Sequence, residues 1–114
     1  LAQVFVNLVT NAISFCEDGD AVRVWARRRE NRVLIVVEDT GPGIPEQALT
    51  KVFKRFYSER PQAEFGQHSG LGLAISKQIV EAHGGVIWAE NIRPTAADPT
   101  SEPLGARFVV GLPV

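Results

Sequence analysis

Three short groups of residues in this chain have types and spacings that could bind a ligand. The first group is Asn7, Asn11 and Ser14, and spacings of four and three residues place them on one side of a helix. An amide oxygen is a hard ligand that can complete the shell of a magnesium ion beside phosphate oxygens. Asparagine is also a mediocre helix former that is often simply half-exposed. Taken alone, this first group is compatible both with magnesium binding and with partly exposed helix residues that bind nothing.

The second group runs from Asp39 to Gly43, where a carboxylate ends a predicted strand and two glycines follow. A carboxylate only accepts hydrogen bonds, so it can select an exocyclic amine such as that of adenine. Glycines let the backbone approach a flat ligand closely. Asp-x-Gly is also common in ordinary turns, and taken alone this group favours the turn.

The third group, Ser69 to Leu73, opens a predicted helix. Free backbone N–H groups and the helix dipole make such an end suitable for phosphate. The glycines could instead allow close packing of the helix on a sheet. The polar, aperiodic stretch 58–69 just before it favours a flexible lid over a ligand. The group is not a P-loop, because no Gly-Lys-Ser/Thr follows, and no parallel strand precedes it as a Rossmann motif requires.

Hydrophobic periodicity predicts the elements that position these groups. Apolar residues at helical spacing predict helices over 2–16 and 71–83, the second ended by Gly84 and Gly85. Strands are predicted over the ranges 21–28, 32–39, 86–91 and 106–112, the first two as an antiparallel hairpin. Residues 21–28 alternate, with Val22, Val24 and Ala26 on one face.

The remaining segments complete the predicted architecture. The run Val33–Val37 is apolar on both sides, so 32–39 should be a central, buried strand. Pro45 suits the first turn of a short helix over 46–51, residues 52–57 are aromatic and basic, and 93–103 is predicted to be a surface loop. The predicted fold class is an α/β (α+β) two-layer sandwich, with a mixed, mostly antiparallel sheet covered by helices on one face.

Composition limits the classes of function. Lys plus Arg number 12 against 13 Asp plus Glu, a net charge of -1, which argues against a general polyanion binder. The single cysteine, Cys16, excludes an internal disulfide and a zinc cluster and is typical of a reducing compartment. No apolar run approaches the roughly 20 residues of a membrane span. The 114 residues suit one domain, and because helical patterning begins at once from Leu1 we expect a fragment of a longer protein.

The order and spacing of the three groups resemble the ATP-binding catalytic domain of bacterial sensor histidine kinases, which has the Bergerat fold of the gyrase and histidine-kinase ATPase superfamily. NLVTNAISF resembles the N box, DTGPGI the G1 box, VFKRFY the F box, HSGLGLAISKQIVEAHGG the G2 box and GARFVVGLP the closing strand. The resemblance covers nearly the whole chain. It implies that 1–114 is such a domain truncated at its N-terminus, because the family's leading strand and helix segment are missing before Leu1.

The resemblance implies a role for each matching residue. Asn11 would coordinate magnesium, with Asn7 nearby, and Asp39 would hold the adenine amine. The other expected nucleotide contacts are Phe15 bordering the nucleotide, Gly41, Gly43 and Ile44 lining the base pocket, Arg55 and Tyr57 at the lid hinge, and Ser69, Gly70, Leu71, Gly72 and Leu73 at the phosphates. Three departures are expected to lower affinity: Ser14 where a lysine is frequent, His68 where a glycine is common, and Arg107 in place of the usual threonine.

The residue one turn before the metal-binding asparagine separates a kinase from a hydrolase. Related ATPases carry a glutamate there, whereas this chain has Asn7, whose amide cannot serve as a general base near neutral pH. Phosphoryl transfer then depends on positioning and on an external acceptor. Neither His68 in the lid nor His83 at a helix end is suited to be the phosphoryl acceptor, because no helical dimerisation segment surrounds them.

The resemblance therefore implies a protein-histidine kinase domain that binds ATP and Mg²⁺ and cannot autophosphorylate alone. Its implied partners are the dimerisation and histidine-phosphotransfer domain of the same kinase and a response-regulator receiver domain. The full-length protein would be a membrane-anchored homodimer, with this domain on the cytoplasmic side of the inner membrane.

Other functions remain open from the sequence. The changes at Ser14 and His68 motivate a nucleotide-free interaction module, and a related ATPase of the same superfamily is a further alternative. Nucleic-acid binding through Arg27, Arg28, Arg29 and Arg32 is opposed by the charge balance. Arginines at a hairpin more commonly form a solvated edge that discourages strand pairing.

Overall fold

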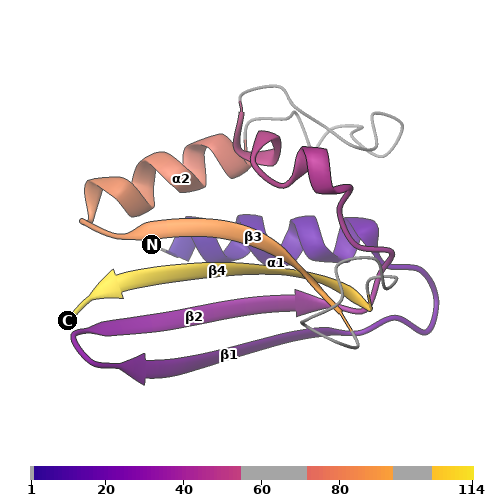
Figure 1. Ribbon diagram of the computed structural model, residues 1–114, viewed down its shortest axis with the longest axis horizontal. Helices are drawn as coiled ribbons and strands as arrows, with labels where there is room; N and C mark the ends of the chain where they lie inside the picture. The colour runs from indigo at the N-terminus through magenta and orange to yellow at the C-terminus, as the bar shows by residue number, and fades with distance from the viewer. Residues whose placement is uncertain (1, 55–71, 94–103) are drawn as a thin grey trace.

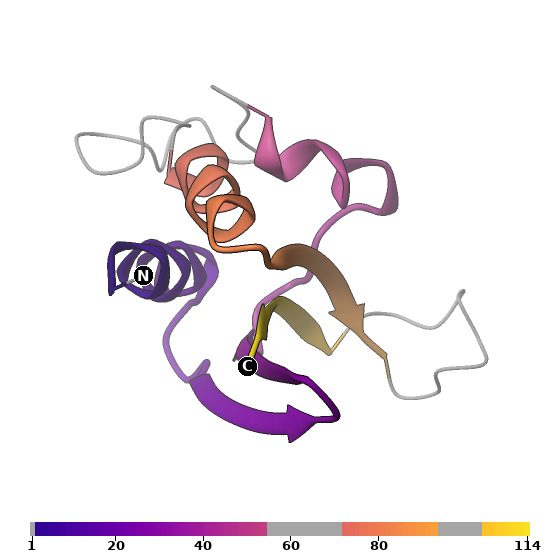
Figure 2. The same ribbon diagram turned by 90° about the vertical axis from the view of Figure 1, so that its left-hand side faces the viewer.

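The computed structural model describes residues 2–54, 72–93 and 104–114. They form one four-stranded antiparallel sheet with two α-helices on a single face (Figures 1 and 2). The helices are α1 (Ala2–Phe15) and α2 (Gly72–Ala82), and the strands are β1 (Val22–Arg29), β2 (Arg32–Asp39), β3 (Val86–Ile92) and β4 (Gly105–Pro113). The strand order is β1-β2-β4-β3, so the predicted two-layer α+β sandwich is confirmed.

The core lies between the helices and the inner face of the sheet. Cross-strand register places Val37 opposite Phe108, and both are almost fully buried. From the helices, Val4, Leu8 and Val80 pack into the same cluster. Because strand side chains alternate between faces, the neighbouring residues Glu38 and Arg107 point to the other face of the sheet. That alternation decides which residues can line a site on the helix side.

One local prediction is wrong. The segment predicted as one helix over 46–51 forms two single 3-10 turns, η1 (Glu46–Ala48) and η2 (Lys51–Phe53). Hydrogen bonds between residues three apart close each turn, and together they bury Ala48 and Val52. In β1, Val22, Val24 and Ala26 share one face as alternation predicts, and Val24 on that face is 52% exposed. β1 is an edge strand of the described sheet, and α1 contacts it far less than β2 does, so this position stays open to solvent.

Other differences are confined to boundaries. The prediction that 32–39 is central is confirmed, although Val33, Leu34 and Ile35 are only partly buried. β4 extends one residue further at each end than predicted, and α2 ends at Ala82. The predicted loop 58–69 and residues 94–103 lie outside the described residues. Within the described part, no helix is long and apolar enough to cross a membrane.

Candidate functional site

Asp39, the last residue of β2, is the buried carboxylate of the candidate site. It is 4% exposed, and its Oδ1 accepts hydrogen bonds from the N–H of Gly41 at 2.9 Å and from the N–H of Ala106 at 3.4 Å. Burial raises the pKa of Asp39 above its ordinary 3.8, while these two hydrogen bonds act in the opposite direction. Both hydrogen bonds end on Oδ1. Among the described contacts Oδ2 accepts none, so it remains available to a donor on a ligand.

Close backbone packing holds this carboxylate in place. A Cβ at Gly105 would lie 1.8 Å from the carbonyl oxygen of Asp39, so only glycine lets the start of β4 come this near. The hydroxyl of Thr40 accepts a hydrogen bond from the N–H of Ala21 at 2.8 Å, which ties the end of β2 to the residue before β1. The position of Asp39 is therefore fixed from both neighbouring strands. No spacing pattern in the sequence points to Gly105, which is only a glycine just before a predicted strand.

The loop after Asp39 is held at its far end as well. Gly43 has φ of +84°, a conformation that favours glycine, and Ile44 is 7% exposed in the core. Asn91 of β3 accepts a hydrogen bond from the N–H of Ile44 at 2.7 Å and donates one to its carbonyl oxygen at 2.6 Å. Sequence reasoning missed Asn91, because an asparagine at the end of a strand pattern carries no signal of such a contact.

Asn7 joins the first and third groups of residues. Its side-chain amide donates hydrogen bonds to the carbonyl oxygen of Gly72 and to the hydroxyl of Ser76, both at 3.3 Å. Ser76, which is fully buried, also donates to the Gly72 carbonyl at 2.8 Å. The start of α2 is thereby attached to the middle of α1. Figure 1 shows this start of α2 beside η2 on the helix side of the sheet.

Asn11 has the unsatisfied polar atom of the described site. Its Nδ2 is buried and has no hydrogen-bond partner among the described residues. The hydroxyl of Ser14 is engaged locally, donating to the backbone carbonyl of Asn11 at 2.6 Å. Since buried amides are normally satisfied, the Asn11 amide is the side chain of α1 best suited to a bound ligand.

The structure describes only part of the predicted site. Asp39, Gly41, Gly43 and Ile44 lie together at the end of β2, and Asn7 meets Gly72, as the preceding contacts show. Leu73 packs its side chain against the core. The predicted contacts Arg55, Tyr57, Ser69, Gly70 and Leu71, with the departure His68, lie outside the described residues, and Phe15 falls in α1 without a described side chain.

Arg107 points away from this site. It makes ion pairs with Glu38 at 3.2 Å and with Glu90 at 3.7 Å, on the sheet face opposite the helices. The structure therefore revises the expectation that this departure weakens nucleotide contacts.

His83 has Nδ1 2.8 Å from the carbonyl oxygen of Ile79, one turn back at the end of α2. This contact agrees with its interpretation as a helix-end residue.

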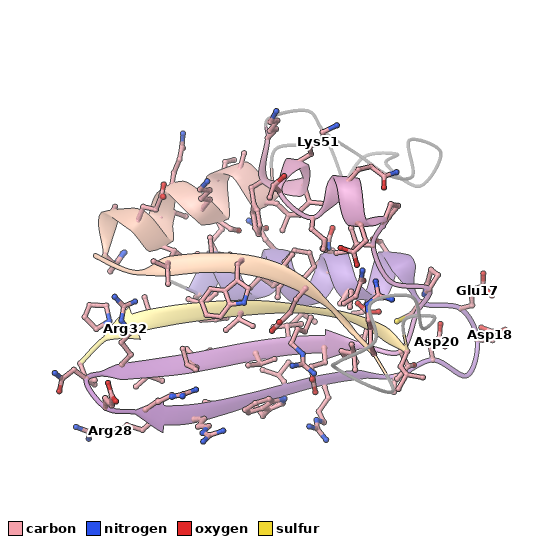
Figure 3. All side chains as sticks on the ribbon, in the orientation of Figure 1. Glu17, Asp18, Asp20, Arg28, Arg32 and Lys51 are labelled. Atoms are coloured by element: carbon pink, nitrogen blue, oxygen red, sulfur yellow. The ribbon has the colours of Figure 1, made fainter. Side chains whose placement is uncertain are left out.

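The two ends of the molecule differ in charge. Glu17, Asp18 and Asp20 lie at the end where β2 finishes, and Arg28 and Arg32 lie at the opposite, β1–β2 hairpin end (Figure 3). The arginines proposed above as a nucleic-acid contact are thus remote from Asp39.

No group of three or more His, Cys, Asp or Glu residues within the described ranges could hold a metal ion. A metal at the site would need Asn11 together with oxygens of the ligand itself.

Comparison with known proteins agrees with this geometry. A family model described as histidine kinase-, DNA gyrase B-, and HSP90-like ATPase matches residues 1–114. The chain belongs to this ATPase family. Sensor protein ChvG of Rhizobium meliloti (strain 1021) is 47% identical over 115 residues, which are 99% of this chain and 19% of that protein. ChvG of Agrobacterium fabrum is 45% identical with the same coverage.

Solved structures show the same fold. The mycobacterial sensor histidine kinase MprB superposes with a TM-score of 0.79 at 35% identity, covering 97% of this chain and 68% of that one. The catalytic domain of histidine kinase ThkA, in a nucleotide-free form, gives 0.76 at 33% identity, with 97% and 64% covered. The chain is a histidine kinase catalytic domain of the ATP-binding type, and it spans about a fifth of the length of the ChvG proteins.

Proposed function

We propose that this domain binds Mg-ATP and delivers the γ-phosphate to a histidine on a separate dimerisation domain, for relay to a response-regulator receiver. The observation that carries the proposal is the buried carboxylate of Asp39, with Oδ2 left as an acceptor beside a glycine loop. A neutral or cationic donor would satisfy that oxygen, and the exocyclic amine of adenine is such a donor. The family supports ATP binding in general.

The remaining contacts of the proposed site are those that the family resemblance implies. Gly41, Gly43 and Ile44 lie in the loop that follows Asp39 and would face the base. Asn11 would hold Mg²⁺ through its amide oxygen together with phosphate oxygens, while its unpartnered Nδ2 is a donor and would not contact the metal. The start of α2 would receive the phosphates through Ser69, Gly70, Leu71 and Gly72, and Arg55, Tyr57 and Phe15 complete the proposed set.

The side chain of Asn7 favours transfer over hydrolysis. It is an amide, and both of its described hydrogen bonds are donated, to Gly72 and Ser76, so it does not supply a base for water. Bound Mg²⁺ would neutralise phosphate charge, and the protein's contribution is to orient the nucleotide. The acceptor histidine would come from outside these residues.

The wider assembly is part of the proposal. The partners would be the dimerisation and phosphotransfer domain of the same kinase and a receiver domain. ThkA, which shares this fold at 29% identity, has been solved in complex with a response regulator, TrrA. The full-length protein would be a homodimeric sensor anchored in the inner membrane with this domain in the cytoplasm, where a single unpaired Cys16 would stay reduced.

Isothermal calorimetry with Mg-ATP tests the proposal. Asp39→Ala should weaken binding roughly 5- to 150-fold, since removing one partner of a buried hydrogen bond costs about 1–3 kcal/mol. Asp18→Ala is the control, because Asp18 is an exposed acidic residue in the turn at the same end of the molecule (Figure 3). Equal affinity of Asp39→Ala and the wild type would refute the role of Asp39.

The nucleotide-free interaction module makes a different prediction. A ligand that binds only the native state raises the melting temperature as its concentration increases. We expect that rise with Mg-ATP, and a smaller one when EDTA removes Mg²⁺. An unchanged melting temperature up to millimolar Mg-ATP would favour the module.

A further inference from the structure

We infer that Asn91 is a positioning residue for the adenine pocket, acting by clamping the backbone of Ile44. The inference rests on the proposed function, because it assigns a role within the proposed nucleotide site. Asn91 lies in β3, 47 residues from Ile44 in sequence, and its single amide both accepts from the Ile44 N–H and donates to the Ile44 carbonyl. With distances of 2.7 and 2.6 Å, one side chain satisfies both polar groups of one backbone residue.

Sheet register connects this clamp to Asp39. Asn91 is the cross-strand partner of Ala106 in β4, and the N–H of Ala106 reaches Oδ1 of Asp39 at 3.4 Å. Asn91, Ala106 and Asp39 therefore lie side by side across β3, β4 and β2. Together they hold both ends of the loop that follows Asp39. The start of the loop is fixed by the Gly41 N–H on the Asp39 carboxylate, and its end is fixed by Asn91 on Ile44.

The segment that follows this loop is also attached to the end of β3. Arg93, which follows β3, forms an ion pair with Glu46 in η1. Its side chain is 14% exposed, whereas that of Glu46 is 63% exposed, so this pair adds less than a buried contact would. The Asn91 amide is the firmer of the two attachments, because it is bonded to Ile44, a residue that is only 7% exposed.

The clamp fixes the distance between the carboxylate that binds the amine and the wall that faces the ring. Without it, the glycine-containing loop gains conformational freedom, which must be lost again when the base binds. The phosphate end of the proposed site lies on α1 and α2, and among the described residues the Asn91 side chain hydrogen-bonds only to Ile44. Loss of the clamp should therefore weaken base binding without altering the transfer step.

Steady-state kinetics of the full-length kinase test this separation. For Asn91→Ala we expect the KM for ATP to rise about tenfold, in line with the loss of two hydrogen bonds, while kcat stays within about twofold of the wild type. Asn91→Asp keeps an acceptor for the Ile44 N–H but turns a carboxylate oxygen toward the Ile44 carbonyl oxygen, so its KM should rise at least as far as that of Asn91→Ala. Glu90→Gln is the matched control, because it alters the neighbouring residue on the opposite face of β3.

Amide hydrogen exchange on the nucleotide-free kinase tests the clamp separately from the function. Exchange in the peptide containing Ile44 should quicken in Asn91→Ala and not in Glu90→Gln. Unchanged exchange, or a fall in kcat with the KM unchanged, would overturn the inference. A wild-type kinase without any ATP dependence would instead refute the proposed function, and the exchange result would still decide whether Asn91 holds Ile44.

Discussion

Substituting Gly105 with alanine should be among the most damaging single-methyl changes in this domain. The added Cβ would lie 1.8 Å from the carbonyl oxygen of Asp39, 2.8 Å from its carbonyl carbon and 3.1 Å from Cα of Thr40. All three atoms are backbone, so no side chain can rotate away. β4 would have to separate from the end of β2 by more than an ångström to restore ordinary contact.

The magnitude follows from the packing. Inserting a methyl group into a packed region commonly costs about 1–3 kcal/mol, and this clash with backbone places Gly105→Ala at about 3 kcal/mol or more. Domains are stable by only about 5–15 kcal/mol, so the loss is large but compatible with folding. With a urea m-value of about 2 kcal/mol/M, the unfolding midpoint should fall by roughly 1.5 M.

Urea unfolding followed by circular dichroism measures this change. Gly19→Ala is the matched control, because a Cβ there meets nothing within 4 Å although φ is +93°. That variant should lose only about 1–2 kcal/mol, the cost of the left-handed conformation for a residue with a Cβ. A midpoint for Gly105→Ala equal to that of Gly19→Ala, or within 0.3 M (about 0.6 kcal/mol) of the wild type, would refute the steric reasoning.

Three further predictions concern single contacts. Ser76→Ala should destabilise the domain by about 1–2 kcal/mol in urea unfolding, because the Asn7 amide loses an acceptor and the Gly72 carbonyl a donor; an unchanged midpoint would contradict this. Arg107→Thr should cost less than about 1 kcal/mol and leave the calorimetric affinity for Mg-ATP unchanged, since its ion pairs are partly exposed and on the other face. Because burial raises the pKa of Asp39 above 3.8, the folded state retains this proton longer than the unfolded chain, and stability from this group falls as pH rises through the raised pKa. Relative to Asp39→Asn, the wild type should therefore lose stability in urea titrations as the pH rises above 3.8, and a gain would show the opposite shift.

The elements that follow a repeating pattern were predictable from the sequence. Apolar spacing places α1 and α2 within a residue or two of their observed bounds, and the paired apolar runs define the β1–β2 hairpin. Periodicity also groups Val22, Val24 and Ala26 on one face of β1, but it cannot tell whether another layer covers that face, and Val24 is 52% exposed. Pro45 indicates a turn start, but whether the next residues bond three or four apart depends on how Ala48 and Val52 reach the core.

The candidate site was predictable only where a residue carries its own chemical signal. Asp39 ends an apolar strand before two glycines, and Asn7 and Asn11 share a helix side, so residue type and spacing find them. Asn91 and Gly105 act through contacts between distant segments that register alone creates. Such contacts have no local pattern, and the sequence could not reveal them.

The most direct test is nuclear magnetic resonance mapping of a non-hydrolysable ATP analogue with Mg²⁺ on this domain. The proposed site predicts that the amides of Gly41, Ile44 and Ala106 shift on titration, while those of the hairpin residues Arg28 and Arg32 do not. Shifts confined to the hairpin, or no shifts at millimolar analogue, would contradict a nucleotide site built on Asp39.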